Sequence, residues 1–131
     1  MIGYVTIGTN DLERAVAFYD QLFAAIDVAR LWKSDAMAAW GPSRERPALC
    51  VTKPFDGASA TVGNGVMIAI KVASQEQVQA LHQRALALGG RDEGEPGPRG
   101  DSGFYAGYFR DLDGNKLNAY LPASRRPADV E

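Results

Sequence analysis

The chain has 131 residues, 46% of them hydrophobic, which suffices for one domain with a sizeable core. Its 14 basic and 16 acidic side chains give a net charge of −2, which argues against a protein that coats nucleic acid. One cysteine excludes an intramolecular disulfide, and one histidine excludes sites built from several imidazoles. No apolar run approaches the roughly 18 residues of a membrane span and no targeting segment is visible, so a cytoplasmic protein without membrane contact is expected.

The first predicted elements are a strand and an amphipathic helix. Residues Ile2–Gly8 are rich in β-branched side chains, which favours a strand. Asn10 and Glu13 have the spacing of a capping box, and this predicts a helix that begins there and runs to about Ala24. Its apolar stripe is formed by Leu12, Ala15, Val16, Tyr19, Leu22 and Phe23. Short strands are expected at residues 28–32, 36–40 and 48–53.

The same pattern returns about 63 residues later. Residues 65–72 form the next predicted strand, and Ser74 with Gln77 forms a second capping box. Gly89-Gly90 then ends the second helix, because glycine readily adopts the left-handed conformation. A glycine- and proline-rich loop is expected at 94–103 before strands at 104–110 and 116–121. Each half therefore follows the order β-α-β-β-β, with residues 54–64 as the connector.

Two segments resemble a known family. Val5–Tyr19 contains Asp11-Leu12 and Phe18-Tyr19, which are similar to the "D-L" and "F-Y" of the family's first strand and helix. Asp111-Leu112-Asp113-Gly114-Asn115 is similar to its closing "D-P-D-G-N" hairpin, with Leu112 in place of the proline. Together they resemble the vicinal oxygen chelate superfamily, which includes glyoxalase I, extradiol dioxygenases, and bleomycin- and fosfomycin-resistance proteins.

The resemblance implies an α+β fold. Two tandem βαβββ modules would form a cup-shaped mixed sheet with the helices on the outside. A single glyoxalase-like domain would cover residues 1–121, with module one at 1–56 and module two at 64–121, followed by a tail at 122–131. Because proteins of this fold commonly pair their modules across a homodimer, we also expect a homodimer.

The resemblance further implies four metal-binding positions, on the first and last strands of each module. They fall at Tyr4, Cys50, Met67 and Asn118 in this sequence. A phenol is mostly protonated at neutral pH and a thioether prefers soft ions, so only Cys50 is a usual ligand for the family's metals. We therefore expect no metal and no cofactor.

Other candidate residues have simpler interpretations. His82 lies on the second helix, which in this fold covers the outer face of the sheet, and is expected to be a boundary or surface residue. Cys50 is expected to pack in the core or a pocket wall. Asp111 and Asp113 suit the hairpin turn. Arg99 lies in the loop 94–103; it is interpreted as a solvated side chain, with an anionic ligand as the alternative. That loop could act as a lid.

Aromatic residues on the predicted strands suggest a small-molecule pocket in the cup. Alternation separates Tyr105 from Tyr108, so both would face inward only if the strand bulged. The alternative is that the aromatic side chains fill the cup. The expected ligand-binding residues are Tyr4, Trp40, Cys50, Met67, Tyr105, Tyr108, Asn118 and Tyr120.

The function hypothesis is a glyoxalase/bleomycin-resistance-like protein that binds a small aromatic or amphipathic molecule without a metal. Asn118 would orient the ligand by hydrogen bonds. The alternative is a divalent-metal-dependent lyase, isomerase or dioxygenase of the same superfamily, and a third possibility is a scaffold for assembly. The sequence names no catalytic residue and leaves enzyme activity undecided.

Overall fold

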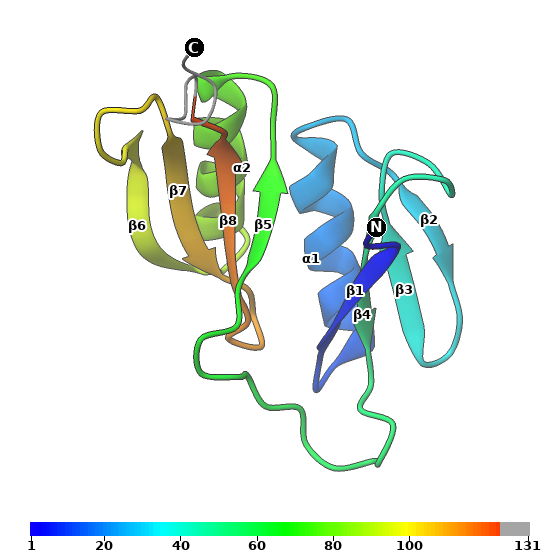
Figure 1. Ribbon diagram of the computed structural model, residues 1–131. Helices are drawn as coiled ribbons and strands as arrows, with labels where there is room; N and C mark the ends of the chain where they lie inside the picture. Colours follow the sequence, from blue (N-terminus) through cyan, green and yellow to red (C-terminus); the bar gives the residue numbers. More distant parts are fainter. Residues whose placement is uncertain (124–131) are drawn as a thin grey trace.

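Two four-stranded sheets and two helices make up the part of the chain that the computed structural model describes, residues 1–123 (Figure 1). The expected tail at 122–131 lies mostly outside these residues. The elements are β1 (Tyr4–Gly8), α1 (Leu12–Ala24), β2 (Arg30–Lys33), β3 (Met37–Trp40), β4 (Ala48–Thr52), β5 (Ile68–Lys71), α2 (Gln75–Ala87), β6 (Arg91–Pro98), β7 (Tyr105–Arg110) and β8 (Lys116–Leu121). No helix among them is long and apolar enough to cross a membrane.

The two sheets repeat one topology. Sheet A has the strand order β1-β4-β3-β2 and sheet B the order β5-β8-β7-β6. In each sheet the first strand of the module pairs in parallel with the last, and the other pairs are antiparallel. The expected α+β fold of two βαβββ modules is confirmed.

One expected loop is largely a strand. Residues 91–98 form β6, which pairs with β7 through a register that shifts on both sides of Gly94. Sequence patterning missed this strand because its glycines and prolines are rare in regular strands. Irregular pairing at the edge of a sheet tolerates them, so the loop predicted at 94–103 is confined to the residues after Pro98.

Local side-chain bonds fix where the helices begin. The N-cap of α1 is Asp11, whose carboxylate accepts the backbone N–H of Arg14, so the predicted cap at Asn10 is wrong by one residue. Asn10 instead bonds the backbone N–H and C=O of Ala60 in the connector. The cap at Ser74 is confirmed, because its hydroxyl accepts the N–H of Gln77.

Each helix covers one face of its own sheet and leaves the other face open. Side chains alternate along a strand, so neighbouring residues lie on opposite faces. In sheet A, Leu49 and Val51 belong to the core under α1, and Cys50 between them lies on the open face. In sheet B, Leu117 and Ala119 face the core under α2, and Asn118 lies on the open face.

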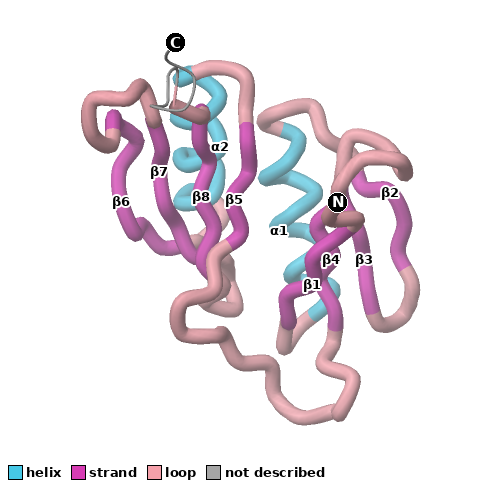
Figure 2. The backbone as a smooth tube through the Cα atoms, in the orientation of Figure 1, coloured by secondary structure: helices cyan, strands magenta, loops and turns pink. Residues whose placement is uncertain are grey.

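The two modules lie side by side, with α1 between the sheets and the connector running below them (Figures 1 and 2). The helices contact each other, and the Arg84 guanidinium on α2 donates to the carbonyl of Gln21 on α1 at 2.7 Å. In Figure 1, α2 lies behind sheet B, so the open face of sheet B is turned toward the viewer.

The hairpin between β7 and β8 ties module two to module one. The Asp113 carboxylate accepts the Thr9 hydroxyl at 2.6 Å and the Asn10 backbone N–H at 2.9 Å. The Asn115 amide donates to the carbonyl of Gly8 at 2.9 Å. The two sequence segments that carry the family resemblance are therefore bonded directly to each other.

Asp111 is the centre of this junction. It is 6% exposed, and its carboxylate accepts the backbone N–H groups of Asp113 and Asn115. It also accepts the Tyr19 hydroxyl of α1 at 2.6 Å. Burial and the two neighbouring carboxylates raise the pKa of Tyr19 well above its usual value, so the phenol remains a proton donor.

Candidate functional site

The open face of sheet A carries a pocket formed by module one. Two of the predicted ligand-binding residues, Tyr4 and Cys50, border it, and its volume is about 360 Å³. The parallel register of β1 and β4 sets the two residues near each other, with Thr6 opposite Cys50. The remaining lining residues are Gly3, Leu31, Trp32, Met37, Ala39, Arg44, Arg46 and Ala48.

The thiol of Cys50 is not activated. The residue is 3% exposed, and burial raises the pKa of its thiol. A raised pKa keeps the sulfur protonated at neutral pH, and a protonated thiol is a weak nucleophile. Cys50 therefore serves as a small, apolar part of the pocket wall, which agrees with the simpler interpretation of this residue.

The open face of sheet B brings together three of the predicted ligand-binding residues. Tyr108 lies opposite Asn118 in the antiparallel register of β7 and β8, and Tyr120 follows two residues along β8. The ring of Tyr120 stacks on Phe104 with centroids 5.6 Å apart. Asn118 is 2% exposed, and its Oδ1 atom is buried without a hydrogen-bond partner among the described residues. An unpartnered buried amide is unusual, because nearly all such groups are satisfied.

A second pocket, of about 530 Å³, adjoins this face. Arg110 and Lys116 line it together with Met67 and residues 62–66, which precede β5. Arg110 is paired with Glu93 at 2.7 Å, and the guanidinium lowers the pKa of that carboxyl. The pocket is therefore polar and lies at the lower end of β8.

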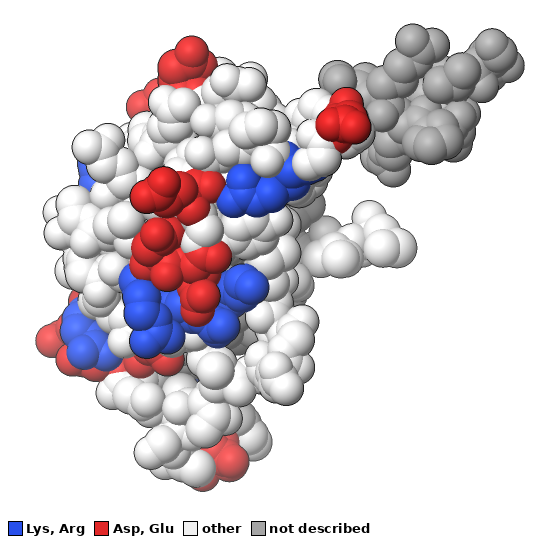
Figure 3. Space-filling view, turned by 90° about the vertical axis from the view of Figure 1, so that its left-hand side faces the viewer, with Lys and Arg blue, Asp and Glu red and all other residues white. Residues whose placement is uncertain are grey.

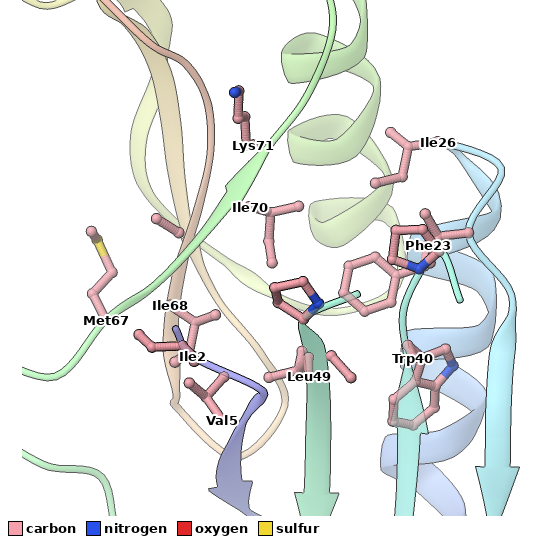
Figure 4. A pocket seen from close by; sticks show the side chains of 15 residues that line it. Ile2, Val5, Phe23, Ile26, Trp40, Leu49, Met67, Ile68, Ile70 and Lys71 are labelled. Atoms are coloured by element: carbon pink, nitrogen blue, oxygen red, sulfur yellow. The ribbon is translucent and has the colours of Figure 1, made fainter. Parts of the chain in front are cut away.

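A third pocket, of about 520 Å³, lies between the modules and is almost entirely apolar. Phe23, Trp40, Leu49 and Ile70 surround it, and Lys71 lies at its margin (Figure 4). The pocket runs along β1 and β5, which are edge strands of the two sheets. Among the described residues, no further strand pairs with the outer edge of either one. Sequence patterning did not predict it, because it depends on how the modules lie relative to each other.

Two predicted site residues lie on the helix-covered faces. Trp40 is 1% exposed, packs on Tyr19 and Phe23 of α1, and donates its indole N–H to Asp20 at 2.9 Å. Tyr105 faces α2, where its hydroxyl accepts the amide of Gln79 at 2.9 Å. The structure therefore separates these two residues from the open faces, where Tyr4 and Cys50 lie on sheet A and Tyr108, Asn118 and Tyr120 lie on sheet B.

His82 is a buried structural residue rather than a surface one. It is 5% exposed on α2, and its Nε2 atom lies 3.0 Å from the Asp92 carboxylate on β6. The hydrogen bond from the Gly94 backbone N–H, and after it the bond to His82, lower the pKa of Asp92. Because α2 covers the face of sheet B opposite to Asn118, the single imidazole is remote from both open faces.

The residues at the four metal positions do not fit a divalent ion. Tyr4 and Cys50 lie on sheet A and Asn118 lies on sheet B, while Met67 precedes β5. A phenol, a protonated thiol, a thioether and a carboxamide are a poor donor set for zinc, manganese or iron. Residues 1–123 contain no group of three or more His, Cys, Asp or Glu that could hold a metal ion.

Paired βαβββ modules, each with one open sheet face, define the vicinal oxygen chelate class of fold. The sequence model of the Glyoxalase/Bleomycin resistance protein/Dioxygenase superfamily matches residues 1–119. The chain therefore belongs to this superfamily. No curated protein matches the chain.

Solved structures agree with this assignment. A glyoxalase/bleomycin resistance protein from Albidiferax ferrireducens T118 is 33% identical with a TM-score of 0.84, over 93% of this chain and 98% of that one. A family enzyme from Burkholderia phytofirmans PsJN is 20% identical with a TM-score of 0.72, over 91% and 96% of the two chains. The fosfomycin resistance protein FosX from Listeria monocytogenes, solved with Mn(II), is 19% identical with a TM-score of 0.71, over 95% and 91%. At such identities the last two show a shared fold alone.

Several pocket residues escaped the sequence interpretation. Trp32, Met37, Arg44 and Arg46 border the pocket on sheet A, although none belongs to a recognisable motif. Lys116 was read only as the first residue of a strand, yet it lines the polar pocket on sheet B. Strand alternation from Asn118 would have placed Lys116 on the same face, so that signal was available.

Proposed function

We propose that this protein binds a small aromatic or amphipathic molecule on its open sheet faces and needs no divalent metal to do so. The donor set is the observation that supports this proposal. Tyr4, Cys50, Met67 and Asn118 stand at positions where, by the family resemblance, metal-binding members usually have His, Glu or Gln. The single histidine is engaged with Asp92 on the opposite face of sheet B.

Aromatic and amide groups support binding of an organic ligand. Tyr4 is 66% exposed beside the pocket on sheet A, so its ring is available for contact. Tyr108 and Tyr120 flank the unpartnered amide of Asn118 on sheet B. Aromatic walls with a few fixed polar groups are typical of small-molecule sites.

We further propose that a homodimer completes the site. Within one chain the pocket on sheet A and the polar pocket on sheet B have no lining residue in common. Exposed apolar side chains lie at the start of β1 and in the residues just before β1 and β5: Ile2, Tyr4, Val66 and Met67 are 55%, 66%, 56% and 38% exposed. A two-fold pairing of these two edge strands would cover the apolar surface and set sheet A of one copy beside sheet B of the other.

Ligand-dependent stabilisation tests the binding proposal. Untagged protein in EDTA is heated with a library of aromatic and amphipathic compounds, and a true ligand raises the melting temperature with its concentration. Tyr4→Ala should weaken this stabilisation, whereas Phe55→Ala, which removes another exposed ring from the connector, should not. Stabilisation that appears only after a divalent metal is added would contradict the proposal.

The mass in solution tests the dimer. Light scattering should give twice the chain mass, and Val66→Glu, which places a charge on the exposed edge of module two, should shift the protein toward the monomer. Asp56→Lys in the exposed connector is a control for a change of surface charge. A monomeric mass at all concentrations would contradict the dimer and leave the binding proposal in place.

A further inference from the structure

Two cations lie beside the Tyr108 ring on the open face of sheet B, and one of them, Lys116, acts together with Arg110 to lower the pKa of the Glu93 carboxyl. The Arg99 guanidinium carbon lies 5.4 Å from the centre of the Tyr108 ring, and the Lys116 ammonium lies 5.6 Å from it. Within residues 1–123 neither forms an ion pair, whereas Arg110 is paired with Glu93. Acidic and basic side chains are interspersed on the side of the molecule next to β6 (Figure 3). Arg99 and Lys116 are distinguished by their shared position beside the Tyr108 ring.

Backbone groups hold Arg99 in place. Its guanidinium donates to the carbonyls of Gly97 at 2.9 Å and Glu95 at 2.8 Å. A Cβ atom at Gly94 would lie 3.3 Å from one guanidinium nitrogen and 3.2 Å from the Tyr108 ring. The glycines of β6 therefore make room for Arg99, and its neutral carbonyl partners leave its charge available.

Lys116 and Asn118 extend this charged area along β8. Both lie on the open face, two residues and about 7 Å apart along the strand. Lys116 also lines the polar pocket of about 530 Å³. The buried Oδ1 atom of Asn118 accepts no hydrogen bond from the described residues, so its capacity as an acceptor is unused.

We propose that this face binds the anionic end of the ligand, and that the ligand is a small organic acid with an O–H or N–H group next to its acid group. Arg99 and Lys116 would contact the anion, Asn118 would accept the neighbouring O–H or N–H, and Tyr108 would support the organic part. This inference rests on the proposed metal-independent binding and names the chemical class of its ligand.

Three matched probes test the proposal. Mandelate carries an acid and an adjacent hydroxyl, phenylacetate lacks the hydroxyl, and mandelamide lacks the charge. Their affinities are measured by two-dimensional NMR of the untagged protein in EDTA. We expect mandelate to bind about tenfold more tightly than mandelamide, with resonances of β7 and β8 shifting, because charge-assisted hydrogen bonds are the stronger ones. Added salt should weaken mandelate binding.

Variants assign the effect to residues. Arg99→Gln and Lys116→Gln should each weaken mandelate binding several-fold, while Lys53→Gln, an exposed lysine after β4, should not. Asn118→Leu should abolish the preference for mandelate over phenylacetate. Its unfolding midpoint should not fall, because the substitution removes an unpartnered polar atom.

The results separate this inference from the proposed function. Equal affinity for mandelate and mandelamide, no effect of Arg99→Gln or Lys116→Gln, or no binding of either acid at millimolar concentration would overturn the inference. In each case metal-independent binding of other compounds would leave the proposed function in place. Binding of the probes only after addition of Mn²⁺ or Zn²⁺ would overturn the proposed function itself.

Discussion

The two modules share a topology but use the same helix position differently. Tyr19 on α1 and His82 on α2 are both buried and occupy corresponding places in the repeat. Tyr19 reaches across to Asp111 of the other module, whereas His82 bonds Asp92 within its own module. This helix position therefore joins the two modules only in module one. In module two the corresponding position stabilises its own module.

The open faces differ as well. Sheet A presents Tyr4 and a protonated Cys50 beside a small pocket. Sheet B presents the unpartnered amide of Asn118 with Arg99 and Lys116 nearby. We therefore expect the anionic end of the proposed ligand to contact sheet B.

The largest effect on stability is expected from Asp111→Ala, which should lower the free energy of unfolding by about 2–4 kcal/mol. The substitution leaves the Tyr19 hydroxyl and two turn N–H groups without their acceptor. Urea denaturation measures the change, and Asp101→Ala in an exposed loop is the control. A loss of less than about 1 kcal/mol would show that Asp111 does not hold the modules together.

A smaller difference is expected between Tyr19→Phe and His82→Leu. Tyr19→Phe removes the hydroxyl that donates to the buried Asp111 carboxylate across the module boundary, while the turn N–H groups still donate to it, so we expect a loss of about 1–3 kcal/mol. His82→Leu frees a carboxylate that water can reach, since the Asp92 side chain is 44% exposed, and should cost under about 1 kcal/mol. Urea denaturation of the two variants measures both losses in the free energy of unfolding. A larger loss for His82→Leu than for Tyr19→Phe would contradict the proposed difference between the modules.

The smallest effect is a pH dependence specific to Tyr19. The pKa of Tyr19 is raised in the folded protein, whereas the unfolded chain loses this proton near pH 10. The stabilisation from the protonated phenol is therefore complete below pH 10 and is lost as the pH rises above it. The stability difference between wild type and Tyr19→Phe should shrink there by up to about 1.4 kcal/mol per pH unit. A difference that stays constant between pH 9 and 11 would contradict this origin.

Much of the fold could be predicted because its signals are local. The helical stripes, the Ser74 cap and the Asp-Gly hairpin are read from neighbouring residues, and the repeat supplies their order. The cap at Asn10 was misplaced because two adjacent residues can both accept a backbone N–H. The strand at 91–98 was missed because irregular pairing with β7, rather than strand propensity, stabilises it.

The site was harder to predict, because the phase of a strand decides which residues share a face. Alternation already separated Tyr105 from Tyr108, and the unbroken register of β7 with β8 places Tyr105 toward α2. Trp40 was predicted to line the pocket because it is an aromatic residue on a strand. In the structure it faces α1, where its indole N–H donates to the Asp20 carboxylate. Contacts between modules, such as Tyr19 with Asp111, lie 92 residues apart in sequence and carry no local signal.

Metal analysis tests the central claim most directly. Untagged protein, purified without chelators, is assayed by mass spectrometry for Zn, Ni, Mn and Fe, since a polyhistidine tag would itself bind these ions. The neutral donor set at Tyr4, Cys50, Met67 and Asn118 predicts metal far below one ion per two chains, with ligand binding unchanged by EDTA. One tightly held ion per chain, whose removal abolishes binding, would contradict the account.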